Sequence, residues 1–403
     1  WKTFLGKTSD KECVPSETGV SSTPTLTNVE MGGQSTSTLF IGGGNSVFYA
    51  LDADTGKILW QTRLGSSPHH FIWSSPAVYD GSVFIGMASL KDCPLVQGQL
   101  FKLDASTGQV QGVFNVVPTG CVGGAVWSSP SIDPETGMVY ISTGNPGGCG
   151  PFTGVPYLFD EVNYLRETHT YAIVKLRASD LHLVGQWRVP LTSDRADIDF
   201  GASPTLFTGS DGQPMVGAAN KNGMFYALDR NDLSAGPVWK TRVSLAITEP
   251  NQLGFSEIST AAFDGKRLYV GGERSLIDGQ LCGGSVRALD PSTGDVLWGH
   301  CFNPKPPSLP PSGPGPVKRF GRDMVFSDAV LGAVTVTPDA VVVGAGRNLA
   351  LLAPGDGKTI TDFTVPAKGI PGNPPAHFWG APAVADGMVF APNMNGILYA
   401  FGG

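Results

Sequence analysis

The sequence of 403 residues predicts an all-β fold, a seven-bladed β-propeller, because one strand–turn–strand tract recurs along it. Residues 45–65 read NSVFYALDADTGKILWQTRLG: an alternating apolar run, a turn with Asp, Thr and Gly, and a second run. Related tracts occupy residues 99–116, 224–243 and 285–302, and a truncated copy, ILYAFGG, ends the chain. Short alternating runs joined by such turns are typical of half-buried antiparallel strands. A period of about 40–60 residues with several strands per unit is typical of a propeller.

Seven units can be aligned on an inner strand of the form S-P-apolar. These strands are STPTL (22–26), SSPAV (74–78), SSPSI (128–132), ASPTL (202–206), STAAF (259–263), GAVTV (332–336) and GAPAV (380–384). The seventh unit has room for only three strands, whereas residues 1–5, WKTFL, resemble the ILWQTRL ending of a repeat. We therefore expect the N- and C-terminal strands to close one blade, which would leave no free sheet edge. Six or eight blades are the alternatives, because the sixth unit is degenerate.

A single domain spanning residues 1–403 is expected, since one array of blades can take up the whole chain. The upper face is defined here as the face with the blade-to-blade connections and the loops between second and third strands. Two insertions interrupt the period on this face, at residues 146–170 and at the Pro-rich residues 303–325. Long loops on compact folds often cover sites, and surface decoration is the alternative.

Charge and composition exclude some classes of partner. The net charge is −7, and Lys and Arg are scattered without a basic tract, so we expect no nucleic-acid partner. No apolar run approaches the ~18 residues that cross a bilayer, so no membrane span is expected. Six cysteines without CxxC spacing favour an oxidising compartment, secreted or periplasmic, over free buried thiols. The start at Trp1 is compatible with removal of a leader.

The hairpin of the fifth unit indicates one disulfide. Cys282 and Cys301 flank a turn near residues 291–294, so both ends of the hairpin return to the upper face. Cys93 and Cys121 are the second candidate pair, and Cys13 and Cys149 are left unassigned.

Six residues suited to ligand binding are expected to meet on the upper face. They directly precede inner strands or lie in second-to-third loops, and they are Trp73, Trp127, Trp379, Asp199, Asn145 and Lys221. Aromatic rings, a carboxylate, an amide and an ammonium would then gather at one mouth of the channel, where ligand sites are common.

Each of these residues has a structural alternative. A Trp can be a packing wedge between blades, and Asn145 before a proline is a common turn residue. The acids of the repeated tract are expected to form turns rather than to catalyse; they are Asp52, Asp104, Asp229 and Asp290. His69 and His70 are expected to belong to a polar rim.

At these residues the chain resembles the quinoprotein alcohol dehydrogenases, which depend on pyrroloquinoline quinone (PQQ), and their polyvinyl-alcohol-dehydrogenase-like relatives. The resemblance covers nearly the whole chain through its PQQ-type repeats. It is sharpest at residues 123–145, GGAVWSSPSIDPETGMVYISTGN, and at residues 197–229, DIDFGASPTLF through ANKNGMFYALD. PQQ and calcium are therefore the implied cofactors.

The resemblance implies a role for each matched residue. Trp127 would form the floor under the quinone, and Lys221 would contact the quinone carbonyl oxygens. Asn145 would coordinate the metal, and Asp199 would lie beside the metal as the general base. Trp73 and Trp379 are placed with the cofactor-binding residues.

The chain departs from the family pattern at several points. The metal-binding Glu of the family should fall near residues 91–93, where Asp92 can substitute only by a one-residue shift. The vicinal Cys-Cys ring is absent, and Gly201 stands where lanthanide-dependent members have a second Asp. No CxxCH occurs, so no built-in c-type haem is expected, and electrons would leave to an external acceptor.

Two functions follow from this pattern. The first is a PQQ-dependent dehydrogenase that oxidises an alcohol, a sugar or a hydroxylated polymer. The second is a non-catalytic PQQ-like propeller that binds a protein or a polysaccharide on its upper face. The retained Trp127, Asn145, Asp199 and Lys221 favour the enzyme, and the missing Glu favours the binding module. A hydrolase has little support, since no Ser-His-Asp or paired-carboxylate pattern stands out.

Overall fold

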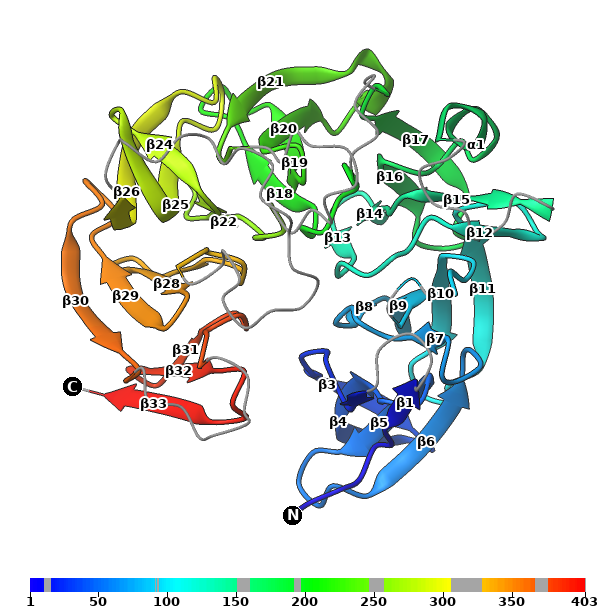
Figure 1. Ribbon diagram of the computed structural model, residues 1–403. Helices are drawn as coiled ribbons and strands as arrows, with labels where there is room; N and C mark the ends of the chain where they lie inside the picture. Colours follow the sequence, from blue (N-terminus) through cyan, green and yellow to red (C-terminus); the bar gives the residue numbers. More distant parts are fainter. Residues whose placement is uncertain are drawn as a thin grey trace. The chain divides into compact units, whose positions relative to one another are not determined.

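Seven antiparallel sheets follow one another along the chain, and each contains one of the seven inner strands expected from the sequence (Figure 1). The structure is a computed structural model. It describes residues 1–10, 16–90, 92, 94–150, 160–191, 197–245, 257–305, 328–366 and 376–402. The described chain is nearly all β, and its one α-helix is α1 (Asp160–Arg166). The predicted fold class, an all-β seven-bladed β-propeller, is confirmed.

The chain divides into two compact units, formed mostly by residues 1–204 and mostly by residues 205–403. Unit 1 holds three blades. The first is β3 (Thr25–Met31), β4 (Gln34–Gly42), β5 (Val47–Asp52) and β6 (Ile58–Arg63). The second is β8 (Ala77–Tyr79), β9 (Ser82–Ser89), β10 (Gln99–Asp104) and β11 (Val110–Asn115). The third is β13 (Ser131–Asp133), β14 (Met138–Ser142), β16 (Ala172–Arg177) and β17 (Leu183–Arg188).

Short elements supplement the blades of unit 1. The strand β7 (His70–Phe71) pairs with β9, β1 (Thr8–Asp10) pairs with β2 (Ser16–Thr18), and β12 (Cys121–Gly123) pairs with β15 (Pro146–Cys149). A 3-10 turn, η2 (Leu233–Ala235), belongs to the same unit.

Unit 2 holds four blades. The fourth blade is β18 (Thr205–Thr208), β19 (Pro214–Asn220), β20 (Met224–Asp229) and β21 (Pro237–Arg242). The fifth is β22 (Ala262–Phe263), β23 (Leu268–Gly272), β25 (Gln280–Leu289) and β26 (Val296–Lys305), with β24 (Ser275–Ile277) paired to β25. The sixth is β27 (Thr335–Val336), β28 (Val341–Ala345), β29 (Asn348–Leu352) and β30 (Thr359–Thr364). The seventh is β31 (Ala383–Ala385), β32 (Met388–Pro392) and β33 (Leu398–Gly402).

Burial differs between the middle and the outer strands of a blade. Every residue of β9 is buried, because a second strand is covered by packed side chains on both of its faces. The outer strand β11 alternates between exposed and half-buried residues, as a strand with one wet face does.

A Trp-x-Thr pair on the outer strand fastens one blade to the turn of the next. The indole Nε1 of Trp60 donates to the carbonyl of Ala105 at 3.0 Å, and Thr62 Oγ1 donates to the carbonyl of Gly108 at 2.6 Å. Trp239 and Thr241 bind the turn of the following blade in the same way, at Pro291 and Gly294.

The acids of the repeated tract shape these turns. Asp104 Oδ1 accepts the backbone N–H groups of Ser106 and Thr107, and the Ser106 hydroxyl bond is the largest cause that lowers the pKa of Asp104. Corresponding bonds to backbone N–H groups are made by Asp52, Asp229 and Asp290. The sequence-based assignment of these acids to turns is therefore confirmed.

The first residues of the chain repeat this fastening. Trp1 Nε1 donates to the carbonyl of Ala53 at 3.0 Å, and Thr3 Oγ1 donates to the carbonyl of Gly56 at 2.5 Å. Residues 1–5 thus occupy, against the first blade, the place of an outer strand. No strand is assigned to them, however, and β33 pairs only with β32 among the described residues. Pairing of residues 1–5 with residues 396–402 remains a prediction, as does the single domain.

Gly294 should be less tolerant of a side chain than any exposed turn glycine. A Cβ at Gly294 would lie 2.4 Å from Cε3 of Trp239, and φ is +74°. Gly212 has φ +87° but open space around its Cβ position, so Gly212→Ala is the matched control. We expect about 1–2 kcal/mol of backbone cost in both variants and a further ~1–3 kcal/mol from overpacking only in Gly294→Ala. Equal losses of apparent melting temperature would contradict the fastening role.

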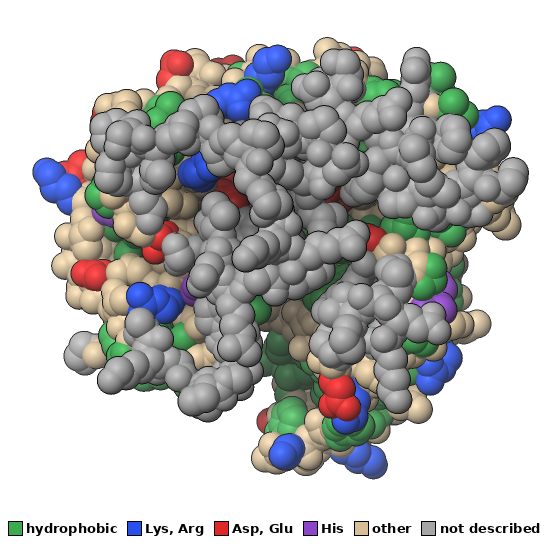
Figure 2. Space-filling model, in the orientation of Figure 1, with side chains coloured by type: hydrophobic (Ala, Val, Ile, Leu, Met, Phe, Trp, Pro, Cys, Tyr) green, Lys and Arg blue, Asp and Glu red, His purple; other side chains and the backbone are tan. Residues whose placement is uncertain are grey.

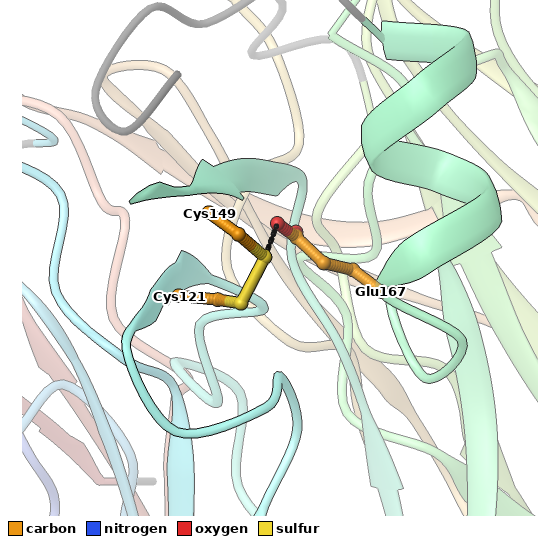
Figure 3. Close-up of side chains that lie close together, drawn as sticks. All are labelled: Cys121, Cys149 and Glu167. Carbon is orange, nitrogen blue, oxygen red and sulfur yellow. Dashed lines mark hydrogen bonds between the residues drawn. A yellow bond between two sulfur atoms is a disulfide. The ribbon is translucent and has the colours of Figure 1, made fainter. Parts of the chain in front are cut away.

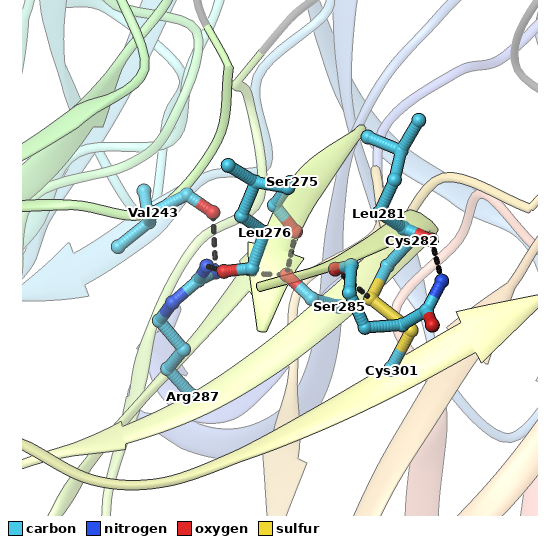
Figure 4. The surroundings of a disulfide bond; sticks show 9 residues. Val243, Ser275, Leu276, Leu281, Cys282, Ser285, Arg287 and Cys301 are labelled. Atoms are coloured by element: carbon cyan, nitrogen blue, oxygen red, sulfur yellow. Dashed lines mark hydrogen bonds between the residues drawn. A yellow bond between two sulfur atoms is a disulfide. The ribbon is translucent and has the colours of Figure 1, made fainter. Parts of the chain in front are cut away.

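Cys282 and Cys301 form the disulfide that the sequence indicated, with a Cα–Cα distance of 5.4 Å across β25 and β26 (Figure 4). Arg287 of the same sheet is buried. Its guanidinium donates to Val243 O, to Ser285 Oγ and to Leu276 O. The bond to Val243 O links the fifth blade to the segment after β21, and the other two lie within the fifth blade.

The surface carries both signs of charge. In the described part of the face shown in Figure 2, Lys and Arg side chains are scattered among Asp and Glu. Among the described residues, none of the helices combines the length and apolar character that crossing a bilayer would take.

Candidate active site

Three of the predicted site residues, Trp127, Asn145 and Asp199, lie in unit 1, next to the ends of strands. Trp127 precedes the inner strand β13, and Asn145 follows the second strand β14. The segment 197–199 precedes the inner strand of the fourth blade but belongs to unit 1. The blade topology therefore brings an indole, an amide and a carboxylate to one end of the third blade.

The amide of Asn145 is oriented by a carboxylate that the sequence did not single out. Asn145 Nδ2 donates to Oδ1 of Asp197 at 2.8 Å, and Asp197 is 9 % exposed. Because the NH₂ group faces Asp197, the amide oxygen must point the other way. Asn145 Oδ1 is buried and has no hydrogen-bond partner in the structure. A buried amide oxygen left without a donor is suited to a hard cation.

A hydrogen bond links the side chains of Asp199 and Trp127. The indole Nε1 of Trp127 donates to Oδ2 of Asp199 at 3.2 Å. Asp199 is buried, whereas Trp127 is half-buried, so part of the indole stays accessible. The bond fixes the edge of the indole and one carboxylate oxygen at once.

The backbone around Asn145 is pinned by a disulfide. The strand β15 starts directly after Asn145 and pairs with β12, where Cys121 lies opposite Cys149 (Figure 3). These two cysteines are bonded, with a Cα–Cα distance of 4.1 Å. The sequence-based pairing of Cys93 with Cys121 was therefore wrong, because the insertion at 146–170 returns to residues 121–123 as a strand. Cys13 and Cys93 lie outside the described residues.

Glu167, just after α1, also holds β15 in place, through hydrogen bonds to its backbone. Its carboxylate accepts the N–H of Gly147 at 2.9 Å and the N–H of Gly148 at 2.7 Å. Burial raises the pKa of Glu167 to about 7, against the lowering effect of these amides and of Arg188. Glu167 also lies 3.7 Å from Sγ of Cys149. This cluster is not a metal centre, because both cysteines are in a disulfide and offer no thiolate.

The raised pKa of Glu167 predicts a pH-dependent stability. Because the folded pKa, about 7, exceeds the usual 4.5, folding favours the protonated acid and loses that advantage as pH rises from about 4.5 to about 7. We expect Glu167→Gln, compared with the wild type, to gain up to ~3 kcal/mol in relative stability over this range. Unfolding by denaturant at several pH values measures it; a difference that stays constant with pH would contradict the assignment.

The remaining predicted residues are placed as follows. Lys221 is buried in the turn between β19 and β20 of unit 2, and its position at a quinone carbonyl remains a prediction. Trp73 of unit 1 packs on Phe71, with ring centroids 4.6 Å apart, and donates to Ser89 O. Both partners belong to the second blade, so neither the cofactor-binding role nor the role as a wedge between blades is tested.

The roles of Trp379 and Asp92 in the site remain predictions. Trp379 belongs to unit 2, where its ring lies 6.0 Å from that of His377. Asp92 is exposed and has φ of 59°. His69 is exposed, and His70 is half-buried with its ring nitrogen on Ser66 O, as expected for a rim.

Sequence reasoning missed two positioning residues. Asp197 was visible as the first acid of the D-I-D segment, and its spacing of two from Asp199 placed it at the same strand start. Glu167 gave no sequence signal, because only folding of the insertion brings it to Gly147 and Gly148.

Comparisons with known proteins find similarity to PQQ-type repeats and to alcohol dehydrogenases. A family model of PQQ-type repeats, described as outer membrane protein assembly factor BamB, matches residues 14–145. A polyvinylalcohol dehydrogenase of Sphingopyxis sp. (strain 113P3) is 26% identical over 408 residues, covering 91% of this chain and 59% of its own length. The quinohemoprotein alcohol dehydrogenase ADH IIB of Pseudomonas putida is 29% identical, over 53% of this chain and 35% of its own length.

A solved structure shares the fold. It is the quinohemoprotein alcohol dehydrogenase ADHIIG from Pseudomonas putida, with a TM-score of 0.62 and 16% identity. The match covers 89% of this chain and 61% of the dehydrogenase chain. The chain spans 59% and 57% of the length of the two polyvinylalcohol dehydrogenases that it matches. The resemblance to PQQ-repeat proteins and quinoprotein dehydrogenases that the sequence indicated is thus confirmed.

Proposed function

We propose that this protein is a PQQ-dependent dehydrogenase that oxidises an alcohol or a hydroxylated polymer at the Trp127–Asn145–Asp199 site. The observation that carries the proposal is the buried oxygen Oδ1 of Asn145. The bond from its NH₂ group to Asp197 orients this oxygen away from Asp197, and no described residue donates to it. The resemblance assigns this oxygen to a metal ion. Nothing in ordinary turn formation requires a buried carboxylate behind the amide.

The donor set fits a calcium ion. Calcium takes oxygen ligands from carboxylates and amides, and Asn145 and Asp199 supply both kinds from neighbouring loops. The third carboxylate proposed from the sequence, Asp92, is exposed, so its role as a ligand rests on the sequence alone. Calcium titration of Asp92→Asn tests that role directly.

Each residue then has one task in the reaction. Bound PQQ would accept the hydride from the alcohol carbon, which is chemistry that no side chain supplies. Asp199 would take the hydroxyl proton, as a carboxylate base within reach of the substrate does. The accessible part of the Trp127 indole would support a flat ring system, and Lys221 would neutralise charge at its carbonyl edge. The two electrons would pass to an external acceptor.

The same proposal includes a secreted or periplasmic location. Two disulfides are present among the described residues, and such bonds persist in oxidising compartments.

The experiment is a dye-linked dehydrogenase assay of the purified chain with added PQQ and calcium. Substrates would include ethanol, butan-2-ol, a sugar and polyvinyl alcohol. The proposal expects reduction of the dye that requires PQQ, calcium and substrate together. Absence of turnover with every substrate, in protein shown to bind PQQ, would contradict it.

The alternative is a non-catalytic propeller that binds a protein or a polysaccharide. The exposure of Asp92 and the match of residues 14–145 to an assembly-factor model favour it. It expects no PQQ binding at all, so binding and turnover together separate the two functions.

A further inference from the structure

A cavity of about 180 Å³ lies between the fifth and sixth blades, within unit 2. Its lining residues come from the end of β26, from the segment before β27 and from the β28–β29 hairpin with its partner β30. They are Phe302, Asn303, Asp328, Ala345, Arg347, Asn348 and Thr364. An acid before an inner strand and polar residues after a second strand are also what form the Asn145–Asp199 site on its own blades. The cavity therefore occupies the corresponding end of the sixth blade.

Hydrogen bonds hold the lining in place. Asn303 Nδ2 donates to Oδ2 of Asp328, and Asn303 has φ of 47°, a left-handed backbone that Asn tolerates. Arg347 donates to the carbonyl of Val365 at 2.7 Å, which fixes the guanidinium at the hairpin. The cavity is thus built by ordered polar groups from three segments.

One lining side chain, that of Asn348, has hydrogen bonds at its nitrogen but not at its oxygen among the described residues. Asn348 Nδ2 donates to Asp362 Oδ2 and to Thr364 Oγ1, both at 2.9 Å, so both donors of the amide are used. Its carbonyl oxygen Oδ1 is buried and has no hydrogen-bond partner among the described residues. A buried acceptor of this kind calls for a donor, and none of the described residues provides one.

A second such group lies next to the lining. His377 is buried, and its Nδ1 has no hydrogen-bond partner in the part of the chain that the structure describes. Burial lowers the pKa of His377, while Asp328 raises it and Arg347 lowers it, so the ring lies within electrostatic reach of both. This end of the blade thus has a second buried polar atom besides Asn348 Oδ1 without a partner among the described residues.

We propose that this cavity is a subsite for a neutral polyhydroxylated chain, such as a segment of polyvinyl alcohol. The charges of Asp328 and Arg347 offset each other, so a charged ligand has no advantage. A hydroxyl group both donates and accepts, and it can therefore satisfy Asn348 Oδ1 and meet the guanidinium or amide donors. At ~30 Å³ per water molecule in the liquid, the cavity holds the equivalent of a few waters, which suits a short run of hydroxylated carbons. The assignment of this cavity to a substrate of the enzyme rests on the proposed function.

The test uses the full chain and two variants of the lining. Asn303→Gly removes the amide and keeps a residue that accepts positive φ, and Asn348→Ala removes the unpaired acceptor. Asp278→Gly, at an exposed residue with φ of 49° on the β24–β25 hairpin, is the matched control. Binding of polyvinyl alcohol and of pentane-2,4-diol is measured in the absence of PQQ, by calorimetry and by light scattering for the polymer.

We expect each lining variant to weaken polymer binding about tenfold, as the loss of one or two hydrogen bonds does, and Asp278→Gly to bind as the wild type does. In the dye-linked assay, kcat/KM for the polymer should fall while kcat/KM for butan-2-ol stays unchanged. Wild-type affinity in both lining variants, or tighter binding of polyacrylate than of polyvinyl alcohol, would overturn the subsite. If the lining variants lose polymer binding but the wild-type chain oxidises no alcohol, the proposed function is wrong and the binding site for the polymer is still supported.

Discussion

Asp199→Asn should lose about 10²–10⁴-fold in turnover while it still binds PQQ, because the base disappears and the platform remains. The amide oxygen of Asn can still accept the bond that Trp127 Nε1 now donates to Asp199, so the indole keeps its orientation. Steady-state kinetics with a saturating alcohol, together with PQQ binding by fluorescence quenching, measure the two effects separately.

Two outcomes of that comparison would count against the assignment. Turnover within a factor of a few of the wild type would show that Asp199 is not the base. Loss of PQQ binding with loss of turnover would show that Asp199 acts mainly by holding the metal ion or the fold. Asp180→Asn, at an exposed carboxylate on the β16–β17 turn, controls for unspecific effects of the substitution.

Asp197→Ala should weaken calcium binding by about 10–100-fold, the usual effect of removing a group that orients a metal ligand. Without the Asp197 carboxylate, the Asn145 amide can rotate and present its NH₂ group where its oxygen now lies. Asp197→Asn is the matched variant: its amide oxygen can still accept from Asn145 Nδ2, so most of the affinity should be kept. Calcium titration calorimetry of the three proteins measures the effect.

The order of the three affinities decides the role of Asp197. We expect the wild type to bind calcium most tightly, Asp197→Asn slightly less tightly and Asp197→Ala far more weakly. Equal affinity in all three would mean that Asn145 needs no orienting partner or binds no cation.

The repeating elements could be predicted because their signals are local. Turn formation by Asp104 needs only Ser106 and Thr107, two and three residues on, and alternation along β11 needs only one neighbouring strand. The inner strands were predictable because seven units of the chain can be aligned on the form S-P-apolar. The Cys282–Cys301 bridge was predictable for the same reason, since one hairpin contains both partners.

The supports of the site could not be predicted because they are non-local. Cys121 and Cys149 meet only after β15 folds back on β12, and neither strand has enough residues to show a pattern. Glu167 reaches Gly147 and Gly148 across the insertion, where no periodicity predicted ordered structure. Asp197 was in view, but its task depends on where Asn145 lies after folding, 52 residues away in sequence.

The most direct test of the central claim is a calorimetric titration of the protein with PQQ, in calcium and again in a calcium chelator. If Asn145 Oδ1 and Asp199 hold a cation beside a quinone platform on Trp127, one PQQ should bind per chain in calcium. The chelator and Asn145→Ala should each weaken that binding. No heat at high micromolar PQQ with calcium present, or binding indifferent to both calcium and Asn145, would contradict the account.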